Sequence, residues 1–201
     1  MPFISICIPA YQRTGYLKRL LDSVAVQSYK DFEVIVTDDS PTPEVEELCG
    51  SYKAFFNISY IKNAIQLGTP ENWNEAIRHA SGQWIKLMHD DDWFTHEGSL
   101  SAFASAAEKH TSAFIFSAYN NIWLDKNDMV EQMFPSQTEI ERVKNEPATL
   151  LASNIIGPPS VIMHKNDKQF LYDTSLKWLV DIEYYYQRLK KEEIFFIEQP
   201  V

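Results

Sequence analysis

Short apolar runs alternate with segments of helical periodicity along the first part of the chain. The apolar runs have the length of buried strands and cover residues 3–8, 32–36, 58–61, 84–88 and 113–117. The segments with helical spacing cover residues 16–26, 43–52, 71–80 and 99–109. Strands that alternate with helices predict a Rossmann-like, mostly parallel central sheet with helices on both faces. We therefore expect an α/β fold.

The alternation weakens after residue 117. We expect residues 122–124 and 129–130 to form a hairpin around Lys126-Asn127-Asp128, and the polar segment 132–145 to form a loop or lid with a short helix. A strand over 160–163, a helix over 179–190 and a strand over 194–197 follow. A chain of 201 residues, 45% of them hydrophobic, supports one domain with two halves, residues 1–117 and a smaller portion, 118–201. The chain stops close to its last predicted strand, so a truncation after Val201 is one expectation.

The balance of charges narrows the choice of partners. The formal net charge is −10, and a protein that binds the phosphate backbone needs a basic surface, so nucleic acid is excluded as the main partner. The sequence has no signal peptide and no apolar run of membrane-spanning length. We expect a cytoplasmic protein, with peripheral association at the inner face of the membrane left open. Cys7 and Cys49 have no neighbours at metal-ligand spacing and are expected to be reduced.

An acidic run, Asp90-Asp91-Asp92, directly follows the predicted strand 84–88. Ligands of open α/β sheets bind at the carboxyl ends of the strands, and three adjacent carboxylates are costly there without solvent or a cation. A hard divalent cation such as Mg²⁺ selects carboxylate oxygens and keeps open positions for a diphosphate. The alternative interpretation is a solvated acidic loop with helix-capping roles. Because a buried strand directly precedes the run, the metal site and the solvated loop are given about equal weight.

Two more segments fall on the same predicted edge of the sheet. Asp38-Asp39 ends the strand 32–36 and can accept hydrogen bonds from a base or ribose, although a turn or N-cap role before Pro41 fits as well. Residues 9–13 follow the first strand, where Tyr11 can pack on a base and Arg13 can meet phosphate. The six glycines are scattered and form no phosphate cradle, so metal, Lys or Arg must neutralise a bound phosphate.

Asp181 and Glu183 stand near the start of the last predicted helix. A carboxylate there is often a surface residue that matches the helix dipole. Its functional reading is a general base that deprotonates an acceptor hydroxyl. The spacing alone does not distinguish Asp181 from Glu183.

The chain resembles family-2 glycosyltransferases. The resemblance is carried by residues 5–13 (SICIPAYQR), 20–24, 27–29, 32–40 (FEVIVTDDS), 72–77, 80–85 and 89–94 (HDDDWF), and continues more weakly from 157 to 190. It implies the GT-A fold and inverting transfer of a sugar from a nucleotide diphosphate, with Mg²⁺ or Mn²⁺ as cofactor.

The resemblance also assigns roles by position. Pro9, Ala10, Tyr11, Arg13, Asp39 and Asp90 would contact the nucleotide-sugar, and Asp38 would brace the loop. Asp91 would bind the metal, Asp92 would hold its loop by hydrogen bonds, and Asp181 would be the catalytic base. The sequence departs from the family at His89, where an acidic residue is common, and at Val180-Asp181, where an acid pair is usual.

The expected activity is thus metal-dependent transfer of a sugar, from a UDP-sugar by preference, in the synthesis of a polysaccharide or glycoconjugate. The acceptor is a saccharide, a lipid-linked sugar or a protein. Two alternatives remain. One is a silent module that binds sugar nucleotides. The other is a different metal-dependent phosphate-ester enzyme, such as a nucleotidyltransferase.

Overall fold

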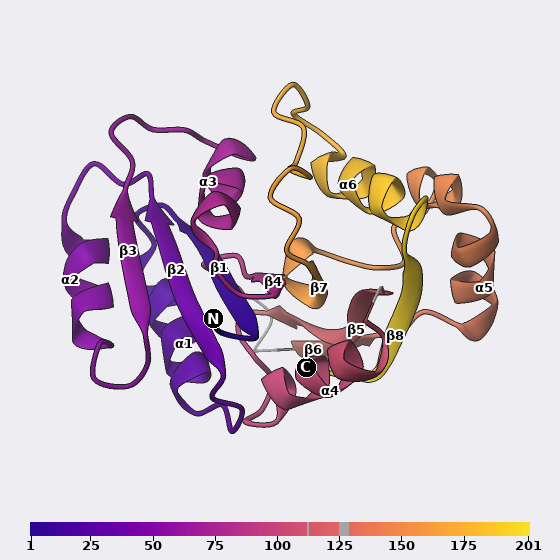
Figure 1. Cartoon of the computed structure of the whole chain (residues 1–201), viewed down its shortest axis with the longest axis horizontal. Helices are drawn as coiled ribbons and strands as arrows, with labels where there is room; N and C mark the ends of the chain where they lie inside the picture. Colours follow the sequence, from indigo (N-terminus) through magenta and orange to yellow (C-terminus); the bar gives the residue numbers. More distant parts are fainter. Residues whose placement is uncertain (112, 125–128) are drawn as a thin grey trace.

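One central sheet organises the chain in the computed structural model, which describes residues 1–111, 113–124 and 129–201 (Figure 1). The strand order is β3-β2-β1-β4-β7-β5-β6, and β8 pairs with β5. Strands β1 to β4 are mutually parallel, β8 runs parallel to β5, and β6 and β7 are antiparallel to their neighbours. The strands are β1 (Ile4–Ala10), β2 (Phe32–Asp38), β3 (Ile58–Lys62), β4 (Trp84–Leu87), β5 (Ala113–Trp123), β6 (Met129–Met133), β7 (Ile162–Lys165) and β8 (Glu193–Pro200).

Helices cover both faces of the sheet, which confirms the predicted α/β arrangement. The helices are α1 (Thr14–Ala25), α2 (Glu44–Ser51), α3 (Glu71–His79), α4 (Ser99–Lys109), α5 (Gln137–Asn145) and α6 (Val180–Leu189), with 3₁₀ turns η1 (Pro147–Leu151) and η2 (Pro159–Val161). The alternation of side chains along β1 divides the core. Ile6 and Ile8 belong to a buried cluster that includes residues of α1, α2 and α4, whereas Cys7 belongs to a second cluster with residues of α3, α5 and α6.

Strand β1 extends further than its apolar run predicted, because Pro9 does not end it. Pro9 and Ala10 pair with Thr37 and Asp38 of β2. The pairing with β4 stops at Cys7 opposite Leu87, so Pro9 lies beyond that ladder, where its missing N–H leaves no bond unmade. The strand therefore delivers residues 9 and 10 directly to the edge where ligands bind.

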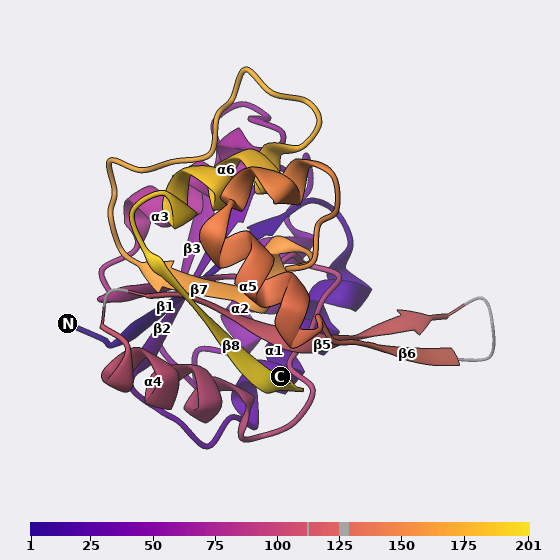
Figure 2. The same ribbon diagram turned by 90° about the vertical axis from the view of Figure 1, so that its right-hand side faces the viewer.

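The predicted hairpin of the second half is present and longer than expected. Strand β5 continues to Trp123 and pairs antiparallel with β6, and this ribbon projects from the body of the molecule (Figure 2). Its expected turn, residues 126–128, lies outside the described residues. The segment 132–145, predicted as a loop or lid with a short helix, contains the end of β6 and helix α5. A capping box between Ser136 and Glu139 starts that helix.

Gly82 is required by a close approach between two strands. A Cβ at this position would lie 2.7 Å from the backbone nitrogen of Ser5, which is nearer than packed atoms allow. The turn before β4 thereby sits directly against β1. In the described part of the chain, no helix is long and apolar enough to cross a membrane.

Candidate functional site

Three loops at the carboxyl ends of β1, β2 and β4 enclose a cavity of about 350 Å³. Six of the predicted site residues line it: Pro9, Ala10, Tyr11, Asp39, Asp90 and Asp91. They come from three segments far apart in sequence, which meet because parallel neighbouring strands end at one edge. The rest of the wall is formed by Gln66, Gly68, Thr69, Asn72, Trp73 and His89.

Asp38 is buried and does not line the cavity. Its carboxylate accepts hydrogen bonds from the backbone N–H of Ser40 and the hydroxyl of Tyr60, both at 2.7 Å, and forms an ion pair with Lys62 at 3.3 Å. These contacts fasten β2 to β3 and shape the turn that follows β2. The geometry agrees with the bracing role expected for Asp38.

Asp39 holds the loop that closes one side of the cavity. Its carboxylate accepts hydrogen bonds from the amide of Asn63 at 2.8 Å and from the backbone N–H groups of Leu67 and Gly68 at 3.0 and 2.7 Å. Gly68 has a φ of +71°, a conformation that favours glycine. The sequence analysis did not identify this loop as part of the site. The only feature of the sequence that indicated a turn here was Gly68, close to Pro70.

Asp90 and Asp91 are adjacent but have different partners. The carboxylate of Asp90 accepts a hydrogen bond from the backbone N–H of Tyr11 at 3.2 Å, and burial raises its pKa to about 6. Oδ2 of Asp91 lies 2.8 Å from Nη1 of Arg13. Asp90 therefore ties the β4 loop to the β1 loop, whereas Asp91 pairs with an exposed cationic side chain.

His89, Asp91 and Asp92 can each direct one ligand atom into a common space. These atoms lie within 4.8 Å of one another, and Nδ1 of His89 is 4.0 Å from Oδ2 of Asp92. Burial lowers the pKa of His89, while the carboxylates of Asp92, Asp91 and Asp181 oppose that shift. A neutral imidazole and two carboxylates are suitable ligands for Mn²⁺ or Mg²⁺, so the residues fit the expected cation. Asp92, expected only to hold the loop, is thus placed among the candidate ligands.

Two aromatic residues position His89. The ring of Trp73 is centred 4.8 Å from the imidazole and 5.1 Å from the ring of Tyr172, which it meets edge-on. The backbone N–H of His89 donates to the hydroxyl of Ser160 at 2.8 Å. Trp73 also lines the cavity. Its role was not foreseen, because an aromatic residue on a helix is usually part of a core.

Asp181 lies in the first turn of α6, after Leu179, whose φ is +58°. Its carboxylate accepts a hydrogen bond from the side chain of Asn154 at 3.4 Å. Its negative charge opposes the lowering of the pKa of His89 by burial. Glu183 follows within the same turn and is also half-buried.

Arg188, on the same helix as Asp181, is buried. Its guanidinium donates to Tyr184, 2.9 Å away, and pairs with Glu192 at 2.6 Å, and it lies 2.8 Å from Nδ1 of His164. These contacts join α6 to β7. Arg188 therefore supports the helix that carries Asp181.

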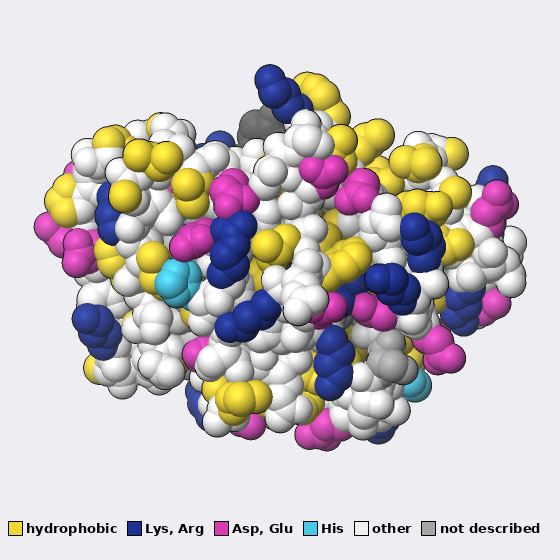
Figure 3. Space-filling model, turned by 45° about the horizontal axis from the view of Figure 1, so that its top comes forward, with side chains coloured by type: hydrophobic (Ala, Val, Ile, Leu, Met, Phe, Trp, Pro, Cys, Tyr) yellow, Lys and Arg dark blue, Asp and Glu magenta, His cyan; other side chains and the backbone are white. Residues whose placement is uncertain are grey.

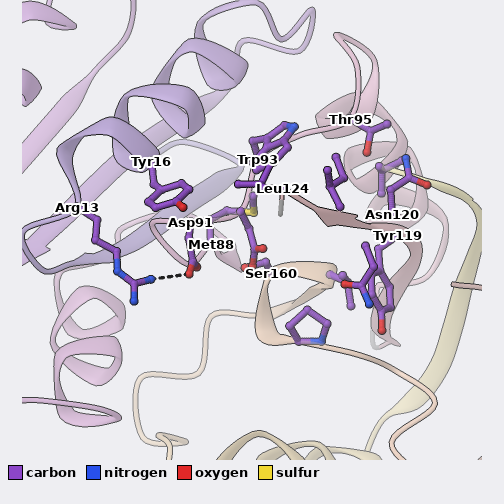
Figure 4. A pocket seen from close by; sticks show the side chains of 16 residues that line it. Arg13, Tyr16, Met88, Asp91, Trp93, Thr95, Tyr119, Asn120, Leu124 and Ser160 are labelled. Carbon is purple, nitrogen blue, oxygen red and sulfur yellow. Dashed lines mark hydrogen bonds and ion pairs between the residues drawn. The ribbon is translucent and has the colours of Figure 1, made fainter. Parts of the chain in front are cut away.

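A second and larger cavity, of about 580 Å³, lies on the other side of Asp91 (Figure 4). Arg13 and Tyr16 of the α1 region, Trp93 after β4, and Tyr119 and Asn120 of β5 line it. Asp91 borders both cavities, so a ligand in one can meet a ligand in the other at this residue. The face in Figure 3 carries acidic and basic side chains intermixed, with no continuous basic patch, as the net charge predicts.

Comparison with known proteins matches residues 5–167 to the family described as Glycosyl transferase family 2. The chain is similar to the Escherichia coli protein named UDP-Glc:alpha-D-GlcNAc-diphosphoundecaprenol beta-1,3-glucosyltransferase WfaP. The two are 30% identical over 141 residues, which cover 70% of this chain and 54% of that protein. The chain thus spans about half the length of this relative.

Solved structures share the fold. The crystal structure of S. aureus TarS 1-349 in complex with UDP-GlcNAc has a TM-score of 0.76 and 18% identity, over 99% of this chain and 57% of that one. The mannosyltransferase PcManGT from Pyrobaculum calidifontis, in complex with GDP-Man and Mn²⁺, has a TM-score of 0.68 and 15% identity, over 99% of this chain and 55% of that one. At these identities the similarity establishes the fold alone.

Proposed function

The chain belongs to glycosyltransferase family 2, and from this premise we propose that it transfers a sugar from a nucleotide diphosphate to a hydroxyl acceptor with inversion. The observation that carries the proposal is the meeting of two cavities at Asp91. A transferase needs a donor and an acceptor side by side, and a module that only binds sugar nucleotides has no use for the second cavity.

The donor is assigned to the cavity lined by Pro9, Tyr11 and Asp39. Tyr11 is partly exposed and can pack on the base, and Asp39 lines the floor with a carboxylate that can accept a further hydrogen bond. The relatives support a UDP-sugar, since WfaP is named for UDP-Glc and TarS was solved with UDP-GlcNAc. Arg13 and Asp90 are assigned to the diphosphate and sugar end, where the two cavities meet.

His89, Asp91 and Asp92 would hold Mn²⁺ or Mg²⁺, with Asp91 as the principal ligand. When bound, such an ion supplies the positive charge that stabilises a leaving diphosphate. The nitrogen ligand favours Mn²⁺, since Mg²⁺ prefers an all-oxygen shell. The manganese in the PcManGT complex supports the same class of ion.

Asp181 is assigned as the general base. Its carboxylate takes the proton from the acceptor hydroxyl as the acceptor oxygen bonds to the anomeric carbon. The bond between that carbon and the phosphate oxygen breaks, and the nucleoside diphosphate leaves from the opposite face. Asp181 stands in the first turn of α6, and the side chain of Asn154 donates a hydrogen bond to one of its oxygens.

The acceptor is a saccharide, lipid-linked or protein hydroxyl. WfaP is named for a diphosphoundecaprenol-linked acceptor, which supports a lipid-linked sugar and a place for this chain at the inner face of the membrane. The expected product belongs to polysaccharide or glycoconjugate synthesis.

The proposal is tested by donor binding followed by transfer. UDP-glucose and UDP-GlcNAc are titrated calorimetrically with Mn²⁺ and with EDTA, and turnover is then followed as UDP release with a panel of acceptor sugars. We expect Mn²⁺-dependent binding and release of UDP, both lost in Asp91→Asn. Binding without turnover in any acceptor would instead identify a silent module. Release of UMP or sugar phosphate would identify a phosphate-ester enzyme.

A further inference from the structure

The larger cavity lies where an acceptor must enter if the proposed function is correct, and the following inference rests on that function. The donor cavity lies at the ends of β1, β2 and β4. The larger cavity continues along the sheet order toward β7 and the β5–β6 ribbon, with Asp91 between the two. The chemistry of its wall therefore indicates what kind of acceptor it takes.

The wall of this cavity combines aromatic and aliphatic side chains with polar ones. Tyr16 and Trp93 form one side and Tyr119 another, whereas Met88 and Val161 lie between them. Aromatic faces of this kind suit the C–H faces of a sugar ring. Polar groups lie both beside the donor, at Asp91, and away from it, at Thr95 and Asn120 (Figure 4). The far end of the cavity, toward the ribbon, is bordered by Ile122 and Leu124.

An uncharged apolar strip continues from the cavity along one face of the ribbon. Antiparallel pairing sets Ile122 opposite Val130 and Asn120 opposite Gln132, so these four side chains share a face. Leu124, two residues after Ile122, borders the cavity as well. Leu124 and Val130 are 45% and 54% exposed on a ribbon that projects from the body (Figure 2).

The absence of charge on this strip is informative in a chain whose net charge is −10. The opposite face of the ribbon also exposes Trp123 and Met129, but it carries the acidic Glu131, paired with Asn121. Half-exposed aliphatic side chains that continue from a binding cavity gain free energy when a ligand covers them. A free sugar or a charged peptide would leave them in water.

We propose that the acceptor is an amphiphile. Its sugar occupies the larger cavity with the reacting hydroxyl toward Asp91, and its alkyl chain lies along the strip formed by Ile122, Leu124 and Val130. The occupant is thus a lipid-linked sugar rather than a soluble saccharide. The ribbon acts as a guide that covers the first methylenes of the lipid next to the sugar.

The test measures how alkyl chain length affects binding. Methyl, hexyl, octyl and decyl β-D-glucosides are titrated calorimetrically below their micelle-forming concentrations, with UDP and Mn²⁺ present. We expect the Kd to fall about twofold to fourfold for each methylene that the strip covers, since a fully buried methylene is worth about fourfold. Val130→Ser should remove most of this dependence and leave the affinity for the methyl glucoside unchanged.

Met129→Ser is the matched control, because Met129 is 48% exposed and belongs to the other face of the ribbon. It should keep the wild-type dependence on chain length. An affinity that does not change with chain length, or an equal loss in both variants, would overturn the proposal. So would sedimentation showing a dimer that Val130→Ser dissociates, since a second copy would then cover the strip.

These outcomes are separate from failure of the proposed function. If UDP and UDP-sugars do not bind at all, the donor assignment is wrong. If they bind while the alkyl increment is absent, only the amphiphilic acceptor is wrong.

Discussion

Nη1 of Arg13 lies 2.8 Å from Oδ2 of Asp91, and this ion pair stands at the point where the two cavities meet. Both side chains are about half exposed, at 58% and 43%. An exposed pair of this kind contributes about 0–1 kcal/mol to stability, so it separates easily. The guanidinium of Arg13 thus pairs with the carboxylate that we assign as a metal ligand. When a cation binds to Asp91, Arg13 can contact a phosphate of the donor instead.

Arg13→Gln should therefore have opposite effects on two ligands. Removing the competing cation should raise the affinity of Asp91 for Mn²⁺ about twofold to fivefold, the range that an exposed ion pair can supply. The affinity for UDP should fall, because a phosphate contact is lost. Calorimetry with Mn²⁺ alone and with UDP in excess Mn²⁺ measures both. Lys18→Gln, which removes a similarly exposed pair with Asp22 on α1, should change neither.

Asp181→Asn should lower kcat about 10²- to 10⁴-fold and leave the Kd of the donor unchanged, since a general base contributes by this factor and does not bind the nucleotide. Glu183 is two residues further along the same helix, and Glu183→Gln should retain most of the activity. Steady-state rates and UDP titrations of both variants provide the comparison. The assignment fails if Glu183→Gln carries the larger loss in kcat.

The two aspartates after β2 should differ in what they support. Asp38→Asn weakens the hydrogen bonds that the hydroxyl of Tyr60 and the backbone N–H of Ser40 donate to this buried carboxylate. It should lower the free energy of unfolding by about 1–3 kcal/mol. Asp39→Asn should release the loop at Leu67 and Gly68 and weaken UDP binding, with a smaller effect on stability. Urea denaturation and UDP titration of each variant distinguish the two roles. Equal effects on both quantities would contradict this division.

The periodicity of the sequence was sufficient to predict the sheet and the residues at its edge. Asp38-Asp39 and Asp90-Asp91-Asp92 were identified because each segment follows an apolar strand, and parallel strands bring their ends together. The choice of Asp39 and Asp91 within these segments came from the family resemblance. Two features could not be predicted in this way. The loop fastened by Asp39 and the contact of Trp73 with His89 depend on side chains that meet across space, and neither has a periodic signal.

The acidic loop shows the same limit. Three adjacent aspartates indicated a candidate site for a cation, but nothing in the sequence pairs Asp92 with His89 or directs Asp90 toward Tyr11. The rotation of each side chain at the end of a strand is set by its neighbours in the fold. A run of identical residues therefore predicts where a site lies more readily than it predicts the role of each residue in the site.

The buried Lys86 of β4 should make stability depend on pH. Its ammonium group donates to the carbonyl of Ser160 and lies 4.7 Å from the ring centre of Phe103, and burial lowers the pKa of Lys86 from 10.5 to about 7. Between these two values the unfolded chain holds a proton that the folded chain lacks, so the free energy of unfolding rises with pH. The slope from this group approaches about 1.4 kcal/mol per pH unit.

The window for the measurement is pH 7 to about 8.5, because burial raises the pKa of Cys7 and of Cys49, and these thiols oppose the trend at higher pH. Lys86→Met should flatten the dependence, since the side chain keeps its length and loses its proton. Lys18→Met, on the exposed face of α1, should keep the wild-type slope. Urea denaturation at several pH values measures all three proteins. If the wild type and Lys86→Met show parallel curves, Lys86 retains its charge in the folded protein, and the Ser160 carbonyl and the neighbouring rings stabilise a buried ammonium ion.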